Sequence, residues 1–327
     1  MPHFSPIDFL MKYLVSLICL FPCCALLAQT DSNDSYRPKI AEFSVEALMD
    51  YHTTSSSEDL GSLQNEVDND RLYKAKIAVP VVMNKQRLIA TQLKYYQYKF
   101  FFDEDEFTED QALYSHLSEA KFTSVGLRAL YREKIGLTDQ LMLAGGAEIN
   151  ADQLQWRQNT TKYFFSGIYS RQISNRTKIG GGFVFNQAMR ITSLYPVFNY
   201  ERQLSPKYHL SLSLPKSIAV RRKINNTNYL IGTAQVRGWR YNLSNAIEGE
   251  TSDLTLRRGD LELSVSWERE IHDWLWFGVT LGYNKNLRYY LAEPGKRQKD
   301  AIINIQSEDA RYAKLSLFIV PPRKFYQ

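Results

Sequence analysis

A histidine and a serine near the middle of the chain have the spacing of a base and a nucleophile. His209 and Ser211 are two residues apart, so both side chains lie on one face if the segment is a strand. A base beside a hydroxyl group is the arrangement that activates serine for acyl transfer. The opposite face is apolar, formed by Tyr208, Leu210, Leu212 and Leu214. Because His209 also stands next to an expected turn, we interpret the pair as coincidental and expect no catalytic residue.

The other reactive groups do not form a metal or cofactor site. Four histidines lie beyond residue 29, namely His52, His116, His209 and His272, and they have no metal-binding spacing. His116 and Ser118 repeat the histidine-serine spacing in an expected loop. The acidic run 103–106 lacks the alternating ligand and glycine order of a calcium loop, so we interpret it as solvated charge. No phosphate loop, dinucleotide fingerprint or nucleophile elbow occurs, and the sequence predicts no cofactor and no enzyme.

Charged side chains occur instead at alternate positions of segments that are otherwise apolar. Between residues 258 and 270, Asp260, Glu262 and Glu268 alternate with Leu261, Leu263, Val265 and Trp267. After an expected turn at 271–273, a second arm alternates in the same way up to Tyr290. Each arm runs about ten residues, the length of a tilted strand that crosses a bilayer. The segment therefore predicts a membrane-spanning β-hairpin with one oily and one ionic face.

A short connection recurs along the chain, and it carries aromatic residues. In four of five copies an aromatic ends a strand, and an arginine and an aliphatic residue follow, as in the run Tyr200-Glu201-Arg202-Gln203-Leu204. Aromatic rings with a polar tip favour the membrane interface. We therefore expect these turns on one rim, with an interface girdle of Tyr131, Tyr169, Tyr200, Trp267 and Trp274.

The connections between those turns differ in kind. We expect long polar loops at 53–70, 103–117, 149–160, 242–256 and 291–306. Short turns on one side and long loops on the other are typical of periplasmic and extracellular rims. Two connections of the outer side, at 187–190 and 214–217, are short, and they predict a low stretch in the outer wall.

The pattern predicts an all-β protein, a transmembrane antiparallel up-and-down barrel. We expect strands at 39–51, 71–82, 87–102, 121–132, 139–149, 162–171, 178–187, 191–202, 207–214, 217–223, 229–241, 258–270, 274–290 and 309–320, which makes fourteen. Twelve strands remain an alternative, because the pair 207–214 and 217–223 is short, and a soluble periplasmic β-sandwich is the alternative fold. Pro80 and Pro196 fall inside expected strands, so we expect bulges or breaks there.

The start of the chain predicts export. An apolar run follows Lys12, and we interpret residues 1–29 as a cleaved signal peptide whose true start is Met11, followed by a barrel domain at 30–327. All three cysteines lie in that leader. The mean hydropathy of −0.37 is compatible with a barrel, in which only every second residue meets lipid. A net charge of +5 without a basic aromatic face argues against nucleic acid.

The signal, the serial turns, the segment Leu214-Pro215-Lys216-Ser217 and the last strand together resemble uncharacterised outer-membrane β-barrel families of Bacteroidota, a domain of unknown function. The resemblance covers the mature chain and implies the Gram-negative outer membrane, but it transfers no functional residue. His209 and Ser211 are similar to the histidine-serine pair of outer-membrane phospholipases. Outer-membrane proteins often end on an aromatic that the assembly machinery reads, and Phe325 or Tyr326 is the candidate here.

The inward-facing charges lead to the expected function. We expect Glu42, Glu46, Lys94, Lys99, Arg237, Glu262, Glu268 and Lys314 to line a polar lumen with weak ion preference. A passive, porin-like pore or small-solute transport barrel is the first hypothesis. A scaffold or adhesin that acts through its loops is the second, and a lipid-modifying enzyme is the third. The expected partners are outer-membrane lipid, lipopolysaccharide and the assembly machinery, and the oligomeric state stays open.

Overall fold

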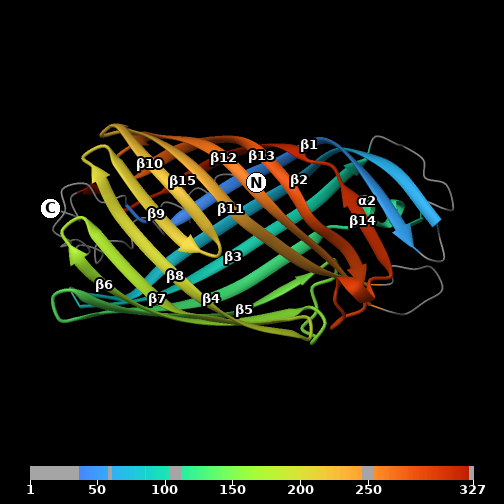
Figure 1. Ribbon diagram of the computed structural model, residues 1–327, viewed down its shortest axis with the longest axis horizontal. Helices are drawn as coiled ribbons and strands as arrows, with labels where there is room; N and C mark the ends of the chain where they lie inside the picture. Colours follow the sequence, from blue (N-terminus) through green and yellow to red (C-terminus); the bar gives the residue numbers. More distant parts are fainter. Residues whose placement is uncertain (1–36, 58–60, 85, 103–111, 245–252, 324–327) are drawn as a thin grey trace, which may run out of the picture.

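The chain folds into one closed antiparallel β-barrel. The computed structural model describes residues 37–57, 61–84, 86–102, 112–244 and 253–323 (Figure 1). Its strands are β1 (Ala41–Ser57), β2 (Gly61–Met83), β3 (Arg87–Phe102), β4 (Phe122–Ile135), β5 (Asp139–Ala151), β6 (Thr161–Ser174), β7 (Thr177–Ala188), β8 (Ile191–Ser205), β9 (Tyr208–Leu214), β10 (Ser217–Asn225), β11 (Asn228–Leu243), β12 (Leu254–His272), β13 (Leu275–Ala292), β14 (Ile303–Ser307) and β15 (Ala310–Ile319). The described ranges also contain a helix, α2 (Ala112–Glu119), and a short 3-10 helix, η2 (Gln298–Asp300).

The last strand closes the barrel on the first. Each strand from β1 to β13 pairs with the next, and β15 pairs with both β13 and β1. Closure removes the two free edges that an open sheet would expose to lipid. The fourteen wall strands are β1 to β13 and β15, so the predicted number is confirmed, and the twelve-strand and β-sandwich alternatives are wrong. The extra strand β14 was not predicted.

Side chains alternate between the two faces of the wall as the sequence predicts. Leu263 and Val265 of β12 are exposed on the outer face, whereas Glu262 and Ser264 beside them are buried inside. In β13 the same alternation exposes Leu281 on the outer face and buries Thr280 inside. An apolar outer face with a polar interior suits a sheet whose solvent outside is hydrocarbon.

The short turns lie at one end of the barrel, and the first and last described residues, Arg37 and Arg323, contact one of these turns (Figure 1). The Arg37 guanidinium lies 3.0 Å from an Asp273 carboxylate oxygen in the turn between β12 and β13. On the other side of the same turn, the amide of Val320 donates to the carbonyl of Trp274. By the usual rule for such barrels this end is the periplasmic rim.

The opposite end departs from the prediction. The expected loop 53–70 is mostly strand, because β1 and β2 continue to Ser57 and from Gly61 with paired residues such as Thr53 and Asn65. Residues 242–256 likewise continue β11 and β12 at their two ends. The expected loop 291–306 contains η2 and most of β14, and α2 begins within the expected loop 103–117 and ends at Glu119. These segments extend past the lipid-facing band, so they lack the alternation by which a spanning strand is recognised.

Two prolines and a glycine, residue types that disfavour strands, lie within the barrel wall. The register shifts between Pro80 and Val82, so the expected bulge is confirmed. Pro196 is different, since it pairs with Phe183 of β7 without a shift, and β9 ends opposite Phe198 on its other side. Its missing N–H therefore breaks no pairing, and the expected break there is wrong. Gly182 lies so close to β6 that a Cβ would sit 2.0 Å from the Gly167 carbonyl oxygen.

Candidate functional site

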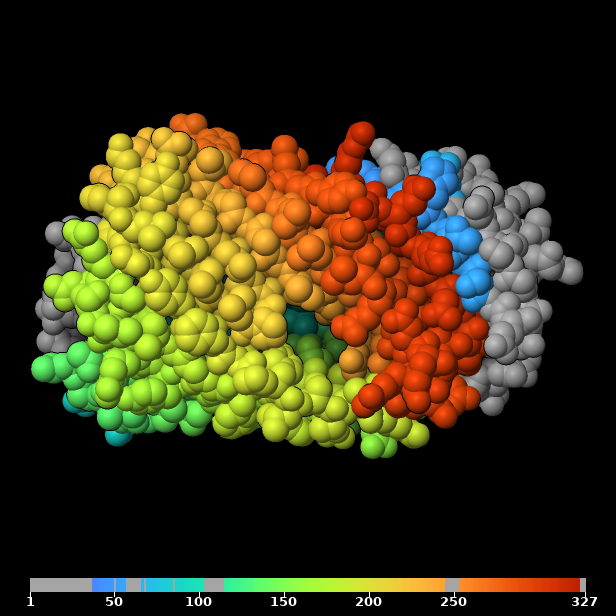
Figure 2. Space-filling view, viewed as in Figure 1, coloured from blue at the N-terminus to red at the C-terminus, as the bar shows by residue number. Residues whose placement is uncertain are grey.

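The barrel wall has a gap above the short hairpin β9–β10. β9 ends with Leu214 opposite Phe198 of β8, and β10 begins with Ser217 opposite Gln235 of β11. Within the described ranges, residues 191–197 of β8 and 236–240 of β11 therefore have no strand partner on the sides that face each other. Figure 2 shows a hole at this place, through which the far wall is visible in teal and green. We call the gap framed by 191–197, 214–217 and 236–240 the lateral window.

Other contacts close the window at its outer end. Arg240 donates to the carbonyl oxygen of Ala188 at 3.3 Å, which ties β11 to the turn after β7. Gly295, in the connection between β13 and β14, comes so near this turn that a Cβ would lie 3.4 Å from Arg190 Cβ. Higher still, Asn242 pairs with Ala151 of β5, so β11 leans over the tops of β6 to β8. The window is therefore a bounded opening in the outer half of the wall.

Apolar side chains surround the window on the outer face. Leu194 is 68% exposed, and Phe198, Leu214 and Val236 are also exposed there. The opening thus leads to the surface that faces lipid, not to water at either rim.

The outer end of the lumen is filled by apolar side chains. We call this cluster the outer plug; its buried members are Leu72, Tyr98, Phe100, Leu117, Phe122, Tyr241, Leu243, Leu254, Leu256, Tyr289, Leu291, Ile303 and Ile305. Leu117 comes from α2 and is fully buried, so the helix packs into the mouth of the barrel. Ring centroids of Tyr98 and Trp239 lie 4.9 Å apart, a distance typical of packed aromatics. Such packing narrows the outer end of the lumen within the described ranges.

A buried charge network lies next to the outer plug. The Arg258 guanidinium is 3.2 Å from Asp70 and 3.1 Å from Asp260, and it also donates to the hydroxyl of Tyr51. Tyr98 donates to Asp70 as well. All these groups are almost inaccessible to water, and each charge has an opposite partner, as buried charges require.

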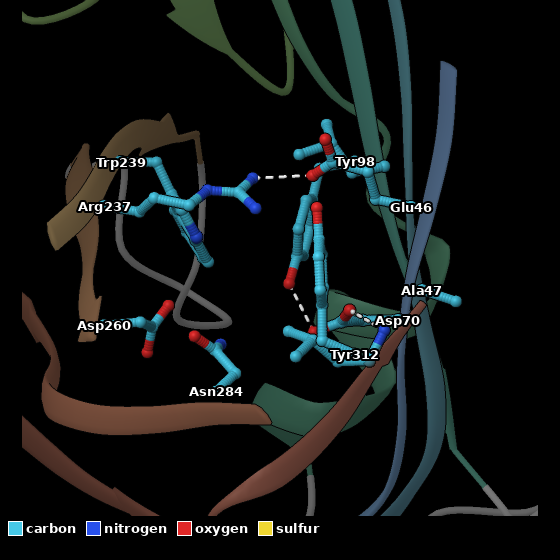
Figure 3. A pocket seen from close by; sticks show the side chains of 11 residues that line it. Glu46, Ala47, Asp70, Tyr98, Arg237, Trp239, Asp260, Asn284 and Tyr312 are labelled. Atoms are coloured by element: carbon cyan, nitrogen blue, oxygen red, sulfur yellow. Dashed lines mark hydrogen bonds and ion pairs between the residues drawn. The ribbon is translucent and has the colours of Figure 1, made fainter. Parts of the chain in front are cut away.

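A second network bridges the lumen. Arg237 of β11 lies 2.7 Å from Glu46 of β1 and 2.6 Å from Glu262 of β12. Figure 3 shows the Arg237 side chain reaching across toward Glu46. Lys74 and Lys314 also pair with Glu46. Beside these groups is a small pocket, lined on one side by Trp239, Asp260 and Asn284.

Seven of the eight predicted lumen residues face the interior, and the eighth, Lys99, does not. Glu42, Glu46, Lys94, Arg237, Glu262, Glu268 and Lys314 are joined in ion pairs, among them Lys314 to Glu42 at 3.2 Å, Lys94 to Glu148 at 2.7 Å and Lys39 to Glu268 at 2.8 Å. Lys99 is on the outer face, because the alternation of β3 buries Tyr98 and Phe100 inside. Lys94 and Lys99 are five residues apart, an odd spacing that cannot place both on one face of a regular strand.

Two cations form no ion pair within the described ranges, although the Glu148 carboxylate acts on one of them, Arg128. Among the described residues, neither Arg128 of β4 nor Lys216 at the tip of the β9–β10 hairpin is within ion-pair distance of an acidic group. The charges that act on Lys216 come from Arg128, Lys76 and Lys162, which are all cations at lumen positions. The Arg128 guanidinium lies 5.6 Å from the ring centroid of Phe164. Sequence reasoning missed both residues, although Arg128 stands at an alternate, inward position of an expected strand.

The remaining candidate reactive residues do not come together in one site. His209 faces the lumen from β9, opposite Gln203 and Arg221. His52 lies at the surface, 3.1 Å from Glu308. The described ranges contain no group of three potential metal ligands and no helix that could span a membrane. The leader 1–29, its cysteines, the acidic run 103–106 and the final aromatics lie outside the described residues.

The predicted girdle residues lie near the periplasmic turns. Tyr169 and Trp274 are exposed, and Tyr131, Tyr200 and Trp267 are partly exposed, on or beside the outer face. The Tyr131 hydroxyl donates to Glu133 at 2.6 Å, and Arg171 lies 3.3 Å from the Tyr169 hydroxyl. Their level in a bilayer stays a prediction.

Known structures with a similar fold are outer-membrane barrels. The chain is similar to a mutant of the Pseudomonas putida TodX monoaromatic hydrocarbon channel, with 8% identity, coverage of 88% of this chain and 92% of that chain, and a TM-score of 0.44. It is similar to the translocator domain of the autotransporter NalP from Neisseria meningitidis, with 9% identity, coverage of 96% and 95%, and a TM-score of 0.37. For a mutant of Escherichia coli outer membrane phospholipase A the values are 8%, 89% and 94%, and 0.35.

No curated protein matches the sequence. One family does match, over most of the barrel. Residues 41–301, from the start of β1 to the connection before β14, match the family described as Domain of unknown function (DUF6268), and the chain belongs to that family.

Proposed function

We propose that this barrel is a transport protein of the Gram-negative outer membrane that passes small apolar solutes between its lumen and the lipid through the lateral window. The observation that carries the proposal is the pairing gap above the β9–β10 hairpin, which opens toward the lipid-facing surface. The axial route is filled at its outer end by the outer plug. The window therefore offers a solute a route between the lipid and the lumen that avoids the filled outer end.

The inward-facing residues of β12 and of β9 differ in how accessible they are. Inward positions of β12 such as Asp260, Glu262 and Glu268 are buried and paired. His209 and Ser211 of β9 are only partly buried at the same kind of position. Part of the accessible lumen thus lies along the hairpin that ends at the window.

The proposal includes place and partners. Outer-membrane lipid and lipopolysaccharide contact the apolar outer face, and the assembly machinery inserts the chain after removal of its leader. His209 and Ser211 have no catalytic part, and the protein is not an enzyme. A test of that statement is turnover of labelled phospholipid by the purified chain: activity that is lost in His209→Ala contradicts it.

The second candidate is a scaffold, and one observation favours it. β1 and β2 project beyond the other strands at the outer end, and β14 pairs with the projecting part of β1 through partners such as Ser55 and Ile305 (Figure 1). A paired projection of this kind is a ready surface for another macromolecule. It leaves the window unexplained, so we place it second.

The test lengthens the short hairpin until it fills the window. Insertion of Thr-Val-Thr-Val after Leu214 and again before Ser217 adds four residues to each arm. An even insertion keeps every side chain on its face, since strand alternation has a period of two. The new segments face residues 194–197 of β8 and 236–239 of β11, and the Pro215-Lys216 tip moves outward with them.

The readout is entry of the apolar dye N-phenyl-1-naphthylamine into cells that produce the protein in their outer membrane. We expect faster dye entry with the wild-type chain than with an empty vector, and entry at the vector level with the lengthened hairpin. Equal amounts of folded barrel are confirmed by thermal unfolding of the purified proteins. Dye entry that is as fast with the lengthened hairpin as with the wild type contradicts the lateral route.

A further inference from the structure

The outer ends of β11 and β12 carry four cross-strand pairs on the face that points away from the lumen. These pairs are Val236 with Leu261, Gly238 with Gly259, Arg240 with Arg257 and Asn242 with Thr255. The residues between them, such as Trp239 and Arg258, have their side chains in the interior, so alternation places the four pairs on the other face. From the lipid-facing band outward, this face therefore changes from apolar to small and then to cationic and polar side chains.

The arginines of this face lie close together. Arg240 and Arg257 stand directly opposite each other, so their Cβ atoms are about 5 Å apart, and like charges in that position destabilise a sheet. Arg288 of β13 pairs with Gly259 and lies across it, because a Cβ on this glycine would be 2.7 Å from Arg288 Nε. No carboxylate of the described chain is among the groups that act on Arg240 or Arg257. Three cations thus gather on one face, and no acidic group described there neutralises the central pair.

Several polar atoms of the same face are buried without a hydrogen-bond partner in the described chain. They are Nε and Nη2 of Arg257, both polar side-chain atoms of Asn242 and the hydroxyl of Thr255. Arg257 is only 5% exposed, and its Nη1 donates to the Tyr290 hydroxyl at 3.0 Å. Buried donors without a partner are rare in native proteins and indicate a bound water or ion. Because Arg257 offers two such donors beside a second arginine, an anion suits this place.

The glycine pair leaves room for a ligand that approaches from the lipid side. Gly238 is exposed, and a Cβ there would have its nearest neighbour, the Arg258 carbonyl oxygen, at 3.7 Å. Arg288 is exposed as well. The four residues from Val236 to Arg240 span about 13 Å of strand, which places the arginine pair just beyond the apolar band. The polar head groups of a bilayer lie at that level.

We propose that Arg240, Arg257 and Arg288 bind the phosphate monoester of an outer-leaflet glycolipid, whose acyl chains lie along the apolar row at Val236 and Leu261. A guanidinium group matches two phosphate oxygens at once, and Arg257 has two donors without a partner in the described chain. The inference goes beyond the lateral route and does not depend on it. Free inorganic phosphate shares the head-group chemistry, and the experiment separates the two sources.

The experiment measures binding of lipid A, which carries phosphate monoesters, to the full chain in micelles of a neutral detergent, by mass spectrometry of the intact complex. The test variant is Arg257→Gln. The matched control is Arg269→Gln, an exposed arginine on the same face of β12 near its other end. We expect the Kd of the test variant to rise at least tenfold, because a charge-assisted pair is lost, and that of the control to change less than twofold.

Two further ligands define what is recognised. Lipid A stripped of its phosphates is expected to bind at least tenfold more weakly than lipid A, and inorganic phosphate at the concentration of the lipid is expected to displace none of it. Equal binding of the stripped lipid shows that the acyl chains alone are recognised. Displacement by inorganic phosphate shows a site for the free anion, and either result overturns the proposal.

A second variant decides the outcome if Arg257→Gln does not fold. Arg288→Gln changes an exposed side chain and leaves the buried groups in place, so we expect a folded barrel whose Kd for lipid A rises about threefold. Thermal unfolding near the wild-type temperature shows that each variant is folded. A wild-type Kd in folded Arg257→Gln, or in Arg288→Gln where the first variant is unfolded, overturns the proposal. Dye entry with the lengthened hairpin tests the lateral route separately.

Discussion

At the scale of single residues, close backbone approach decides where glycine is required. Two neighbouring glycines of β7 differ sharply: a Cβ on Gly182 would lie 2.0 Å from the Gly167 carbonyl oxygen, whereas a Cβ on Gly181 has its nearest neighbour at 3.9 Å. The triple glycine in the sequence indicates a need for space. It does not show which of the three residues meets the neighbouring strand, because that depends on the coiling of β6 against β7.

The glycine difference gives a first prediction. Gly182→Ala forces β6 and β7 apart, so we expect it to lower the free energy of unfolding by about 1–3 kcal/mol, the usual cost of overpacking. Gly181→Ala is the control, and we expect it to change the free energy by less than about 0.5 kcal/mol, as for an uncrowded surface site. Urea unfolding of the refolded barrel in micelles measures both. Equal losses in the two variants contradict the close approach.

Buried charge gives a second prediction at the same scale. Arg258→Met leaves Asp70 and Asp260 buried without their cation, so we expect a loss of about 3–5 kcal/mol in the free energy of unfolding. Arg87→Met is the matched control, because its pair with Glu133 is exposed and such pairs contribute about 0–1 kcal/mol. The same urea titration compares them. A loss of under 1 kcal/mol in Arg258→Met shows that the network does not hold the interior together.

At the scale of elements, the sequence predicts the strand segments that face lipid, because their side chains alternate. It does not predict the strand segments that extend beyond the lipid-facing band. The strand 87–102 is found with both predicted bounds, and all fourteen wall strands occur at their predicted places. The outer parts of β1 and β2 carry serine, threonine and acidic residues on both faces, so their sequence reads as a loop. These segments are strands because β1 and β2 pair with each other there, which neither segment shows in its own sequence.

The low stretch at 214–217 could be predicted from connection lengths, but the window could not. A short hairpin between two long strands leaves a gap only if β8 and β11 fail to pair above it. That outcome depends on where β11 leans, and its contacts with Ala188 and Ala151 join segments far apart in the chain. Element lengths therefore indicate the place of the opening, and tertiary contacts determine its frame.

The projecting hairpin gives a prediction at this scale. Replacement of residues 55–63 by Asn-Gly removes the tip of β1–β2 and its pairs with β14, but keeps the pairing of β1 with β15 from Ala41 to Met49. If transport follows the lateral window, we expect dye entry to change less than twofold. Loss of dye entry in this variant, with the barrel still folded, assigns the route to the outer end and favours the second candidate function.

At the scale of the whole molecule, alternation tells which side chains face inward but not what they do there. Arg237 and Glu46 are 191 residues apart in sequence and meet across the lumen. Local patterns place each on the inner face, and their pairing follows only from the closed cylinder. The same holds for the outer plug, whose members come from seven strands and one helix. A polar inner face thus indicates a lumen, while packing decides whether it is open.

This packing leads to the last prediction, which concerns ion flow. An apolar plug and paired charges occupy the outer end of the lumen in the described ranges, and a window that opens on hydrocarbon offers no path to ions. We therefore expect planar bilayers with the folded wild-type barrel to show no conductance steps above leak, although the same protein speeds dye entry into cells. The lengthened hairpin should be equally silent and should lose dye entry, which ties transport to the window. Conductance steps with the wild type contradict a closed axial route and favour an aqueous pore, whereas silence together with vector-level dye entry favours a scaffold. Only the combination of electrical silence and dye entry fits a barrel that transports sideways.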